Sequence, residues 1–348
     1  MFEKSFITDC EGPLTLNDNA YELAAHFIEN GSELFKVLSL YDDYLADIVK
    51  KENYKVGNTL KFILPFFVCE NLKNQDMIDF SQKNIYAVRD SKFLLKYLKK
   101  AMNTYIVSTS YGQYIEALSN YMDFPFENTF YTKVDVDALT LNDEEMEKIT
   151  KFKQEILSDP ENYELFDEIF YSEIPKMGIY ETIKEINVVG GEGKKEAIDE
   201  IIGRDNINTG EILYIGDSIT DVEPLDFARK NNGISISFNG NEYPLKVAEI
   251  AIVSPSAITT CVIVNIYAKD DKQTVLRFID DYNTSKNLEE LFEKYDVDLE
   301  IKNRFLDVFS NGEYPIIKII DDDNFEDILN VSKDMRNNIR GQDIGELG

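Results

Sequence analysis

Short apolar runs that end in small or acidic residues recur along the chain at wide intervals. Each run is rich in Ile, Val, Tyr or Phe and is bounded by turn-forming residues, as strands buried on both faces of a parallel sheet are. The four clearest runs lie at residues 5–9, 104–108, 212–217 and 234–238. We predict a strand at each of them.

Amphipathic helical patterns, with apolar residues spaced by three and four, follow or adjoin the last three of these runs. They cover residues 112–121, 221–230 and 243–248. Alternation of strand, loop and helix is typical of an α/β protein whose parallel sheet carries helices on both faces. The sequence therefore predicts a doubly wound, Rossmann-like parallel sheet.

The first two predicted strands are separated by about 90 residues, most of which show helical periodicity. A crossover between parallel strands needs only about a dozen residues, so we expect an inserted helical cap domain before the crossover helix. In chain order, we assign residues 1–15 and 88–255 to the α/β core with a mostly helical insertion at about 122–188, residues 16–87 to the cap, and residues 256–348 to a mostly helical C-terminal extension.

The C-terminal extension has a pattern of its own. Residues 257–282 predict a pair of helices split near residues 269–271, and residues 312–321 form either a strand or an extended segment. We expect the final GQDIGELG to be frayed, because chain ends are seldom ordered unless they are tied down.

The chain of 348 residues is 43% apolar, enough for a sizeable buried core, and its formal net charge is −29. An acidic field of that size disfavours nucleic acid and anionic membrane surfaces as partners. No apolar stretch reaches the roughly 18 residues of a membrane span, and the three cysteines form no disulfide or metal-binding pattern. We therefore expect a cytoplasmic protein with free thiols, no membrane insertion and no nucleic-acid partner.

Asp9 and Glu11 follow the first predicted strand. The carboxyl end of a parallel strand is where α/β folds bind ligands, and two carboxylates two positions apart can divide nucleophilic attack and proton transfer between them. Acidic residues are also common in loops for local reasons, so this plainer interpretation stays open.

Ser108 and Thr109 end the second predicted strand, just before a helical pattern. A hydroxyl beside the amides of a helix N-terminus is suited to binding phosphate. A plain helix-capping role is the alternative.

A glycine-rich segment, GGEGKKEAI, opens an amphipathic helix at residues 190–198, but it lacks the P-loop pattern GxxxxGK[ST]. Lys194, at the start of this helix, is suited to contacting phosphate oxygens. A solvated surface lysine is the alternative interpretation, and we expect Lys195 to face solvent.

The strongest single pattern is a buried run that leads into Gly216 and Asp217, with Asp221 four positions later at the start of a helix. Carboxylates at a strand end supply the hard oxygen ligands that Mg²⁺ prefers. The pattern predicts a magnesium site beside the predicted phosphate site.

These motifs in this order, each near the carboxyl edge of the predicted sheet, resemble the haloacid dehalogenase (HAD) superfamily. The resemblance covers roughly residues 3–15 and 88–255, and residues 233–254 look similar to phosphoserine-phosphatase-like members. It implies a Mg²⁺-dependent phosphatase that acts on a small soluble phosphorylated metabolite through an aspartyl-phosphate intermediate. The implied roles are Asp9 as nucleophile and Mg²⁺ ligand, Glu11 as acid/base with its backbone carbonyl on the metal, Ser108, Thr109 and Lys194 as phosphate-binding residues, Lys194 also as a catalytic residue, and Asp217 and Asp221 as Mg²⁺ anchors.

Two residues depart from the DxDGT pattern of this superfamily. Glu11 stands where Asp is usual, which adds a methylene at a site where a displacement of about 1 Å matters. Pro13 stands where Thr is usual, so the loop lacks a hydroxyl and an N–H. The carboxyl group of Glu11 is retained, and proton transfer is preserved in principle.

The string DCEGPLTLNDNAYELA and the long C-terminal extension further resemble an archaeal and methanogen group of HAD proteins labelled subunit R of energy-converting hydrogenase A. The sequence has no cysteine cluster for iron–sulfur or nickel. Beside the phosphatase, a second hypothesis is therefore a catalytically weak accessory subunit of a hydrogenase complex. It would bind a protein partner through its acidic surface or its C-terminal extension.

Overall fold

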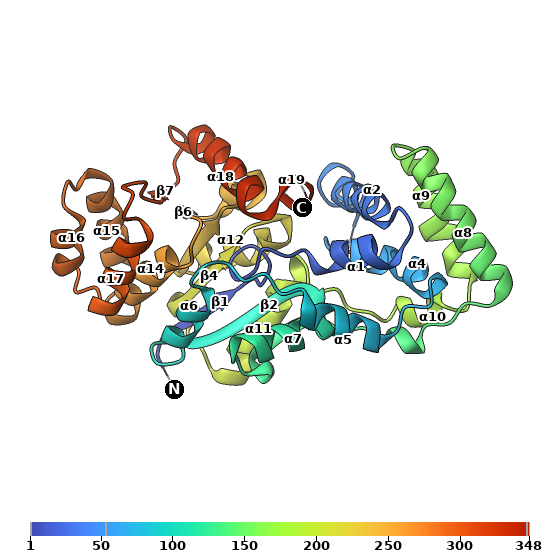
Figure 1. The fold of residues 1–348 in the computed structure, drawn as a ribbon, viewed down its shortest axis with the longest axis horizontal. Coiled ribbons are helices and arrows are strands. Elements are labelled where there is room, and N and C mark those ends of the chain that lie inside the picture. Colours follow the sequence, from blue (N-terminus) through green and yellow to red (C-terminus); the bar gives the residue numbers. More distant parts are fainter. Residues whose placement is uncertain (1, 53, 346, 348) are drawn as a thin grey trace. The chain divides into compact units, whose positions relative to one another are not determined.

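The computed structural model describes residues 2–52, 54–345 and 347. Within them, seven strands form one sheet in the order β3-β2-β1-β4-β5-β6-β7 (Figure 1). β1 pairs in parallel with β2 and β4, and the parallel pairing continues through β5 to β6. The strands are β1 (Ser5–Thr8), β2 (Asn103–Tyr111), β3 (Thr129–Thr132), β4 (Ile212–Gly216), β5 (Ile234–Phe238), β6 (Ile250–Val253) and β7 (Ile316–Ile319).

This sheet, flanked by helices, confirms the predicted α/β fold. The order of its first five strands is the doubly wound order, in which the chain switches direction between β1 and β4. The central strands β1, β4 and β5 are buried at every position, which explains why their sequences are continuous apolar runs.

The sheet differs from the prediction in three of its strands. β3 and β6 were not predicted, because each is only four residues long and no candidate site residue follows it, as Asp9 follows β1. Residues 312–321, left open as strand or extended segment, contain β7, which pairs antiparallel to β6. The sheet is therefore mixed, and an antiparallel edge strand on a largely parallel sheet is a common arrangement.

Contacts divide the chain into two compact units, and β2 passes from the first to the second. The predicted C-terminal extension, apart from its last two residues, falls in the same unit as the first strand. The first unit comprises Met1–Asn17, Tyr86–Val107 and Lys194–Glu346, and the second comprises Asp18–Ile85, Ser108–Gly193 and Leu347–Gly348.

The first unit is built around α14 (Ile258–Lys269), a helix with buried side chains on all sides. It packs against α6, α15 and α17 in the core, which explains why this segment is the most apolar run of the chain. No helix among the described residues is long and apolar enough to cross a membrane. The other helices of this unit are α6 (Ser91–Leu98), α11 (Glu192–Asp205, whose first two residues belong to the second unit), α12 (Val222–Lys230), α13 (Glu242–Val247), α15 (Lys272–Thr284), α16 (Leu288–Lys294), α17 (Leu299–Val308), α18 (Phe325–Arg340) and α19 (Gln342–Gly345).

The second unit is mainly helical. Two π-helical turns interrupt its helices, at Tyr44–Ile48 and Ile169–Glu173, and such turns are frequent at functional sites. Its α-helices are α1 (Asn19–Phe27), α2 (Gly31–Asp43), α3 (Thr59–Phe62), α4 (Leu64–Cys69), α5 (Asn74–Lys83), α7 (Gly112–Met122), α8 (Asp143–Ser158), α9 (Tyr163–Glu168) and α10 (Tyr180–Ile183).

The chain end corrects one expectation. The segment expected to be frayed contains α19, and its Gly345 lies so close to Asn337 on α18 that an added Cβ would stand 2.2 Å from the Asn337 side chain. The backbone of α19 is thus packed against α18, and tertiary contacts order it despite its polar sequence. Residues 346 and 348 lie outside the described residues.

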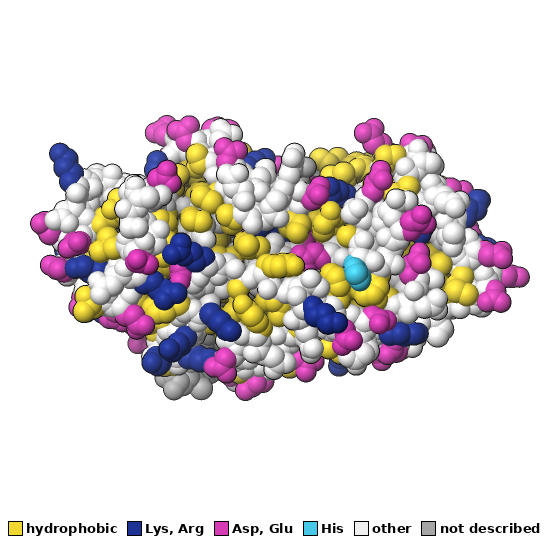
Figure 2. Space-filling view, in the orientation of Figure 1, with side chains coloured by type: hydrophobic (Ala, Val, Ile, Leu, Met, Phe, Trp, Pro, Cys, Tyr) yellow, Lys and Arg dark blue, Asp and Glu magenta, His cyan; other side chains and the backbone are white. Residues whose placement is uncertain are grey.

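Charged side chains of both signs are interspersed over the face drawn in Figure 2. The only histidine of the chain, His26, is exposed at the end of α1 and packs against Phe27 and Phe80. It lies in the second unit.

Candidate functional site

Asp9 follows β1 directly and continues its pairing with β4, since the Asp9 amide donates to the Ile215 carbonyl at 2.9 Å. Its side chain is buried. One carboxylate oxygen accepts a hydrogen bond from the Cys10 amide at 2.6 Å, and the other lies 2.7 Å from Nζ of Lys194. The strand end therefore holds this carboxylate in one orientation against a cation.

Asp221 lies opposite, beyond β4, and both of its carboxylate oxygens are engaged by the protein. Oδ1 accepts from the Tyr214 hydroxyl at 2.6 Å and from Lys194 at 2.7 Å. Oδ2 accepts from the amides of Asp217 and Ser218 at 3.0 and 3.1 Å. A Cβ at Gly216 would stand 2.3 Å from the Asp221 carboxyl carbon, so only glycine allows this close approach.

Lys194 is completely buried on α11 and joins the two carboxylates. Burial alone would lower the pKa of Lys194, but the attraction of Asp221 and Asp9 outweighs it and raises the pKa. The same attraction lowers the pKa of Asp221 against the effect of burial, whereas burial raises the pKa of Asp9 to about 8. Lys195, by contrast, is partly exposed and pairs with Asp199 on the same helix.

Asp217 is bound by two arginines that were not predicted from the sequence. Oδ2 of Asp217 accepts hydrogen bonds from Arg336 and, at 3.0 Å, from Arg340, both on α18. Their side chains are 3% and 5% exposed, as buried as the carboxylate itself. The only sequence signal is a spacing of four on an amphipathic helix, which surface arginines share.

The loop after β1 closes over the same carboxylate. Gly12 has a φ of +98°, and a Cβ there would stand 2.2 Å from Oδ2 of Asp217. Glu11, before it, is half-buried and forms an isolated parallel bridge with Thr15. The backbone of this loop therefore depends on glycine at position 12.

The donor set suits a divalent cation. Carboxylate oxygens of Asp9, Asp217 and Asp221 lie within 4.8 Å of one another, the one such acidic group among the described residues. Hard oxygen donors converging at a strand edge are what Mg²⁺ prefers. The Glu11 side chain is not a member of this group.

Ser108 and Thr109 lie in the second unit, in the last part of β2. Ser108 is buried, and its hydroxyl accepts from the Ser110 amide at 3.2 Å, as in a local turn. The Thr109 hydroxyl is buried without a hydrogen-bond partner in the structure. Their phosphate-binding role stays a prediction.

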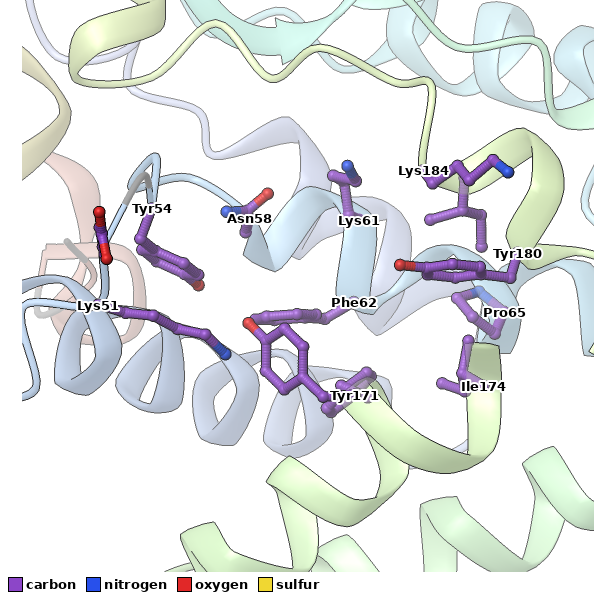
Figure 3. A pocket seen from close by; sticks show the side chains of 13 residues that line it. Lys51, Tyr54, Asn58, Lys61, Phe62, Pro65, Tyr171, Ile174, Tyr180 and Lys184 are labelled. Atoms are coloured by element: carbon purple, nitrogen blue, oxygen red, sulfur yellow. The ribbon is translucent and has the colours of Figure 1, made fainter. Parts of the chain in front are cut away.

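The second unit also holds a cavity of about 290 Å³ that the sequence did not indicate (Figure 3). Lys51 extends toward Tyr171, with its ammonium 3.0 Å from the ring centroid. Burial lowers the pKa of both Lys51 and Lys61. The lining residues are Lys51, Glu52, Tyr54, Asn58, Lys61, Phe62, Pro65, Phe170, Tyr171, Ile174, Tyr180, Ile183 and Lys184.

Buried Asp42 holds one wall of this cavity in place. Its carboxylate accepts from the Tyr54 hydroxyl at 2.6 Å, the Gly57 amide at 2.9 Å, and the Thr59 amide and hydroxyl at 3.0 and 2.9 Å. Burial raises the pKa of Asp42 although these hydrogen bonds oppose it. No ion pair of Asp42 occurs within the described parts of the chain, so hydrogen bonds alone stabilise this carboxylate.

Fold and site together define an α/β protein with a buried cluster of three aspartates and one lysine at the carboxyl ends of two adjacent parallel strands. The gene product AF1437 from Archaeoglobus fulgidus has a solved structure that is similar over 99% of both chains, with 27% sequence identity and a TM-score of 0.83. The similarity therefore includes the C-terminal part of the chain as well as the sheet.

Two phosphoserine phosphatase structures are less similar to this chain. An apo phosphoserine phosphatase is 13% identical, with a TM-score of 0.47 over 73% of this chain and 95% of that one. A substrate-bound phosphoserine phosphatase complex is 14% identical, with a TM-score of 0.48 over 74% and 95%. No family model matches the chain, and no curated protein does either.

Proposed function

We propose that the protein is a phosphatase of the HAD type that hydrolyses a small phosphorylated metabolite, with Asp9 as the nucleophile. The observation that carries the proposal is the position of Asp9. Its carboxylate stands at the end of a central strand, 2.7 Å from a fully buried lysine and within 4.8 Å of two further aspartates. Such a concentration of buried charge is costly for stability and typical of active sites.

In the proposed reaction, a carboxylate oxygen of Asp9 attacks phosphorus and the ester P–O bond breaks. Glu11 donates a proton to the leaving alkoxide, which departs as an alcohol. Glu11 then accepts a proton from the water that attacks the aspartyl-phosphate, which releases phosphate and restores Asp9. Lys194, with its raised pKa, keeps its positive charge throughout and stabilises the phosphoryl oxygens.

Asp9 and Asp217 would hold Mg²⁺ directly, together with the backbone carbonyl of Glu11. The cation would neutralise charge on the phosphoryl group. Asp221 would act at a distance, because the protein already engages both of its carboxylate oxygens. Ser108 and Thr109 would bind the phosphate, as the sequence resemblance implies.

The test is release of phosphate from p-nitrophenyl phosphate and from a panel of phosphorylated metabolites, with Mg²⁺ and with EDTA. We expect Asp9→Asn to abolish turnover. Asp226→Asn, which changes a surface carboxylate on α12 paired with Lys230, is the matched control and should keep it. Wild-type turnover no greater than that of Asp9→Asn across the panel would sink the proposal.

The role of Glu11 has a separate test. Nitrophenolate leaves readily without a proton, whereas an alkoxide needs one. Glu11→Gln should therefore slow hydrolysis of alkyl phosphates more than hydrolysis of p-nitrophenyl phosphate. An equal loss on both substrates would assign Glu11 a structural role and leave Asp9 as the nucleophile.

A second candidate is the accessory protein of low activity, and one observation favours it. Two arginines already bind Asp217, which the hydrolase needs as a metal ligand. This candidate predicts no turnover in the wild type or after removal of both guanidinium groups. Association with a hydrogenase complex stays a prediction from the sequence resemblance.

A further inference from the structure

The site-facing stripe of α18 has two halves. Its first turns are apolar and pack Phe325, Ile328 and Leu329 against Leu245 and Ala251. Its later turns present Ser332, Arg336 and Arg340 at intervals of four residues, which places them on one face of the helix. The apolar half anchors the helix on α13 and β6, and the polar half is directed at the loops that follow β1, β4 and β5.

The polar half makes a set of buried hydrogen bonds. Ser332 donates to the Gly240 carbonyl at 2.7 Å. Arg336 binds the side chain of Asp217 and, at 3.1 Å, its carbonyl oxygen, while its Nε donates to the Gly345 carbonyl at 2.8 Å.

Arg340 connects two loops. Beside its bond to Asp217, it donates through Nε to the carbonyl of Leu16 at 3.2 Å and through Nη2 to that of Asn17 at 2.6 Å. Nε and Nη1 of Arg336 and all three nitrogens of the Arg340 guanidinium thus donate to acceptors of the protein itself. A guanidinium engaged in this way positions its carboxylate and is not arranged as a clamp for phosphate.

The cluster contains as many basic side chains as acidic ones. Three carboxylates, of Asp9, Asp217 and Asp221, face three cations, of Lys194, Arg336 and Arg340, and none of these side chains is more than 8% exposed. Buried ions are tolerated only when they are paired in this way.

A divalent cation on Asp217 would upset that balance. It would add two positive charges close to two guanidinium groups, in a region where charges are screened far less than in water. It would also compete for a carboxylate of which one oxygen already accepts two charge-assisted hydrogen bonds.

We propose that Arg336 and Arg340 are positioning residues that hold Asp217 in place of a divalent cation, so that metal binding and docking of the second half of α18 oppose each other. The proposal rests on the metal site of the proposed function and adds to it a built-in competitor. Because such coupling is reciprocal, the metal must loosen the docked helix by the same factor by which the helix weakens the metal.

The first experiment measures Mn²⁺ binding to the metal-free full-length protein, by electron paramagnetic resonance and calorimetry, without substrate. We expect Arg340→Gln and Arg336→Gln to bind Mn²⁺ more tightly than wild type, by about 5- to 150-fold, the usual range of coupling. Arg340→Lys, which keeps the charge, should stay closer to wild type. Lys333→Gln, an exposed residue of the same helix paired with Glu242, is the control and should not change the affinity.

The second experiment needs no arginine variant and covers the case in which those variants fail to fold. Hydrogen exchange of wild type should accelerate in residues 332–345 when Mg²⁺ is added, and exchange in α14 should not change. Asp217→Asn should abolish the response. Mg²⁺ that leaves exchange of α18 unchanged, or slows it, overturns the proposal.

The experiments can overturn the hydrolase proposal and the proposed competition independently of each other. Tight wild-type Mn²⁺ binding that is insensitive to both arginine variants overturns the competition and leaves the hydrolase standing. Tighter binding by the variants without any turnover overturns the hydrolase and leaves the competition standing. Unchanged or weaker Mn²⁺ binding by folded variants overturns the competition in either case.

Discussion

The two units differ in whether a fully or partly buried lysine is paired with a carboxylate. In the first, Lys194 is fully buried between Asp9 and Asp221 at 2.7 Å from each. In the second, neither Lys51 nor Lys61 forms an ion pair with any described residue, and both line a cavity with aromatic walls. Burial acts on all three ammonium groups, but only Lys194 has carboxylates close enough to overcome it.

The pKa directions follow from this difference. Attraction raises the pKa of Lys194, whereas burial lowers the pKa of Lys51 and of Lys61. The positive charge of Lys194 therefore stabilises the folded unit, and the charges at the cavity cost stability. Of the three lysines that line the cavity, Lys184 is paired with Glu181, whereas Lys51 and Lys61 have no carboxylate partner among the described residues.

The largest expected effect is at Lys194. Lys194→Met leaves Asp9 and Asp221 buried without a counter-charge, and we expect the free energy of unfolding to fall by about 3–5 kcal/mol. Lys195→Met, one position along on the partly exposed side of α11, should change it by no more than about 0.5 kcal/mol. Chemical denaturation of both variants measures the difference, and similar losses would mean that the buried ion pairs contribute nothing.

A smaller effect is expected at Tyr54, since Asp42 is a buried carboxylate that relies on hydrogen bonds alone. Tyr54→Phe removes the 2.6 Å bond to Asp42 and should lower the free energy of unfolding by about 1–3 kcal/mol. Tyr180→Phe, which removes a hydroxyl from the same cavity, is the control, because that hydroxyl has no partner among the described residues. Equal effects in thermal unfolding would contradict the supporting role of Asp42.

The pH dependence should separate the two kinds of lysine. The pKa of Lys61 is lowered in the folded state, so its contribution to stability is present above the unfolded pKa of about 10.5 and is lost as pH falls through the lowered value. The stability of wild type relative to Lys61→Met should therefore rise between pH 7 and pH 10, by a few tenths of a kcal/mol for this half-exposed group. Lys148→Met, on the exposed side of α8, should show no such slope, and a slope of opposite sign for Lys61→Met would refute the direction.

The smallest effect concerns chemical reactivity. Because its pKa is lowered, Lys51 carries more free amine at pH 8 than an ordinary surface lysine does. Acylation followed by mass spectrometry should modify Lys51 several times faster than Lys148, and Lys194 should remain unmodified. Modification of Lys194 at the rate of Lys148 would contradict its burial in the ion-paired cluster.

The central strands of the sheet can be predicted from the sequence. Strands buried on both faces must be continuously apolar, so β1, β4 and β5 appear as runs of Ile, Leu, Tyr and Phe. β3 and β6 were not predicted and β7 stayed ambiguous, because a run of about four residues is too short for its periodicity to separate strand from helix, and no candidate site residue follows any of the three. The pair of helices α14 and α15 was predicted with a split near residues 269–271, and in the structure Asp271 caps α15 by accepting from the Thr274 amide.

Candidate site residues that directly follow a strand can also be predicted from the sequence. Asp9, Asp217 and Asp221 are candidates from sequence because each stands at or just beyond the carboxyl end of a predicted strand, and the structure brings them within 4.8 Å of one another. The sequence also predicted that Lys195 faces solvent and Lys194 does not; in the structure Lys194 is fully buried and Lys195 is partly exposed, since consecutive residues of a helix point about 100° apart.

What the sequence determined by itself is therefore the sheet, the order of its motifs and the acidic residues at its edge. Only the tertiary structure decided which basic side chains pair with those acidic residues. Arg336 and Arg340 lie 119 and 123 residues from Asp217 in the chain, on a helix whose sequence looks like an ordinary amphipathic surface helix. No local pattern encodes a contact over that separation, because it depends on how α18 packs against β6 and α13, and that packing places two cations beside the buried carboxylate of Asp217.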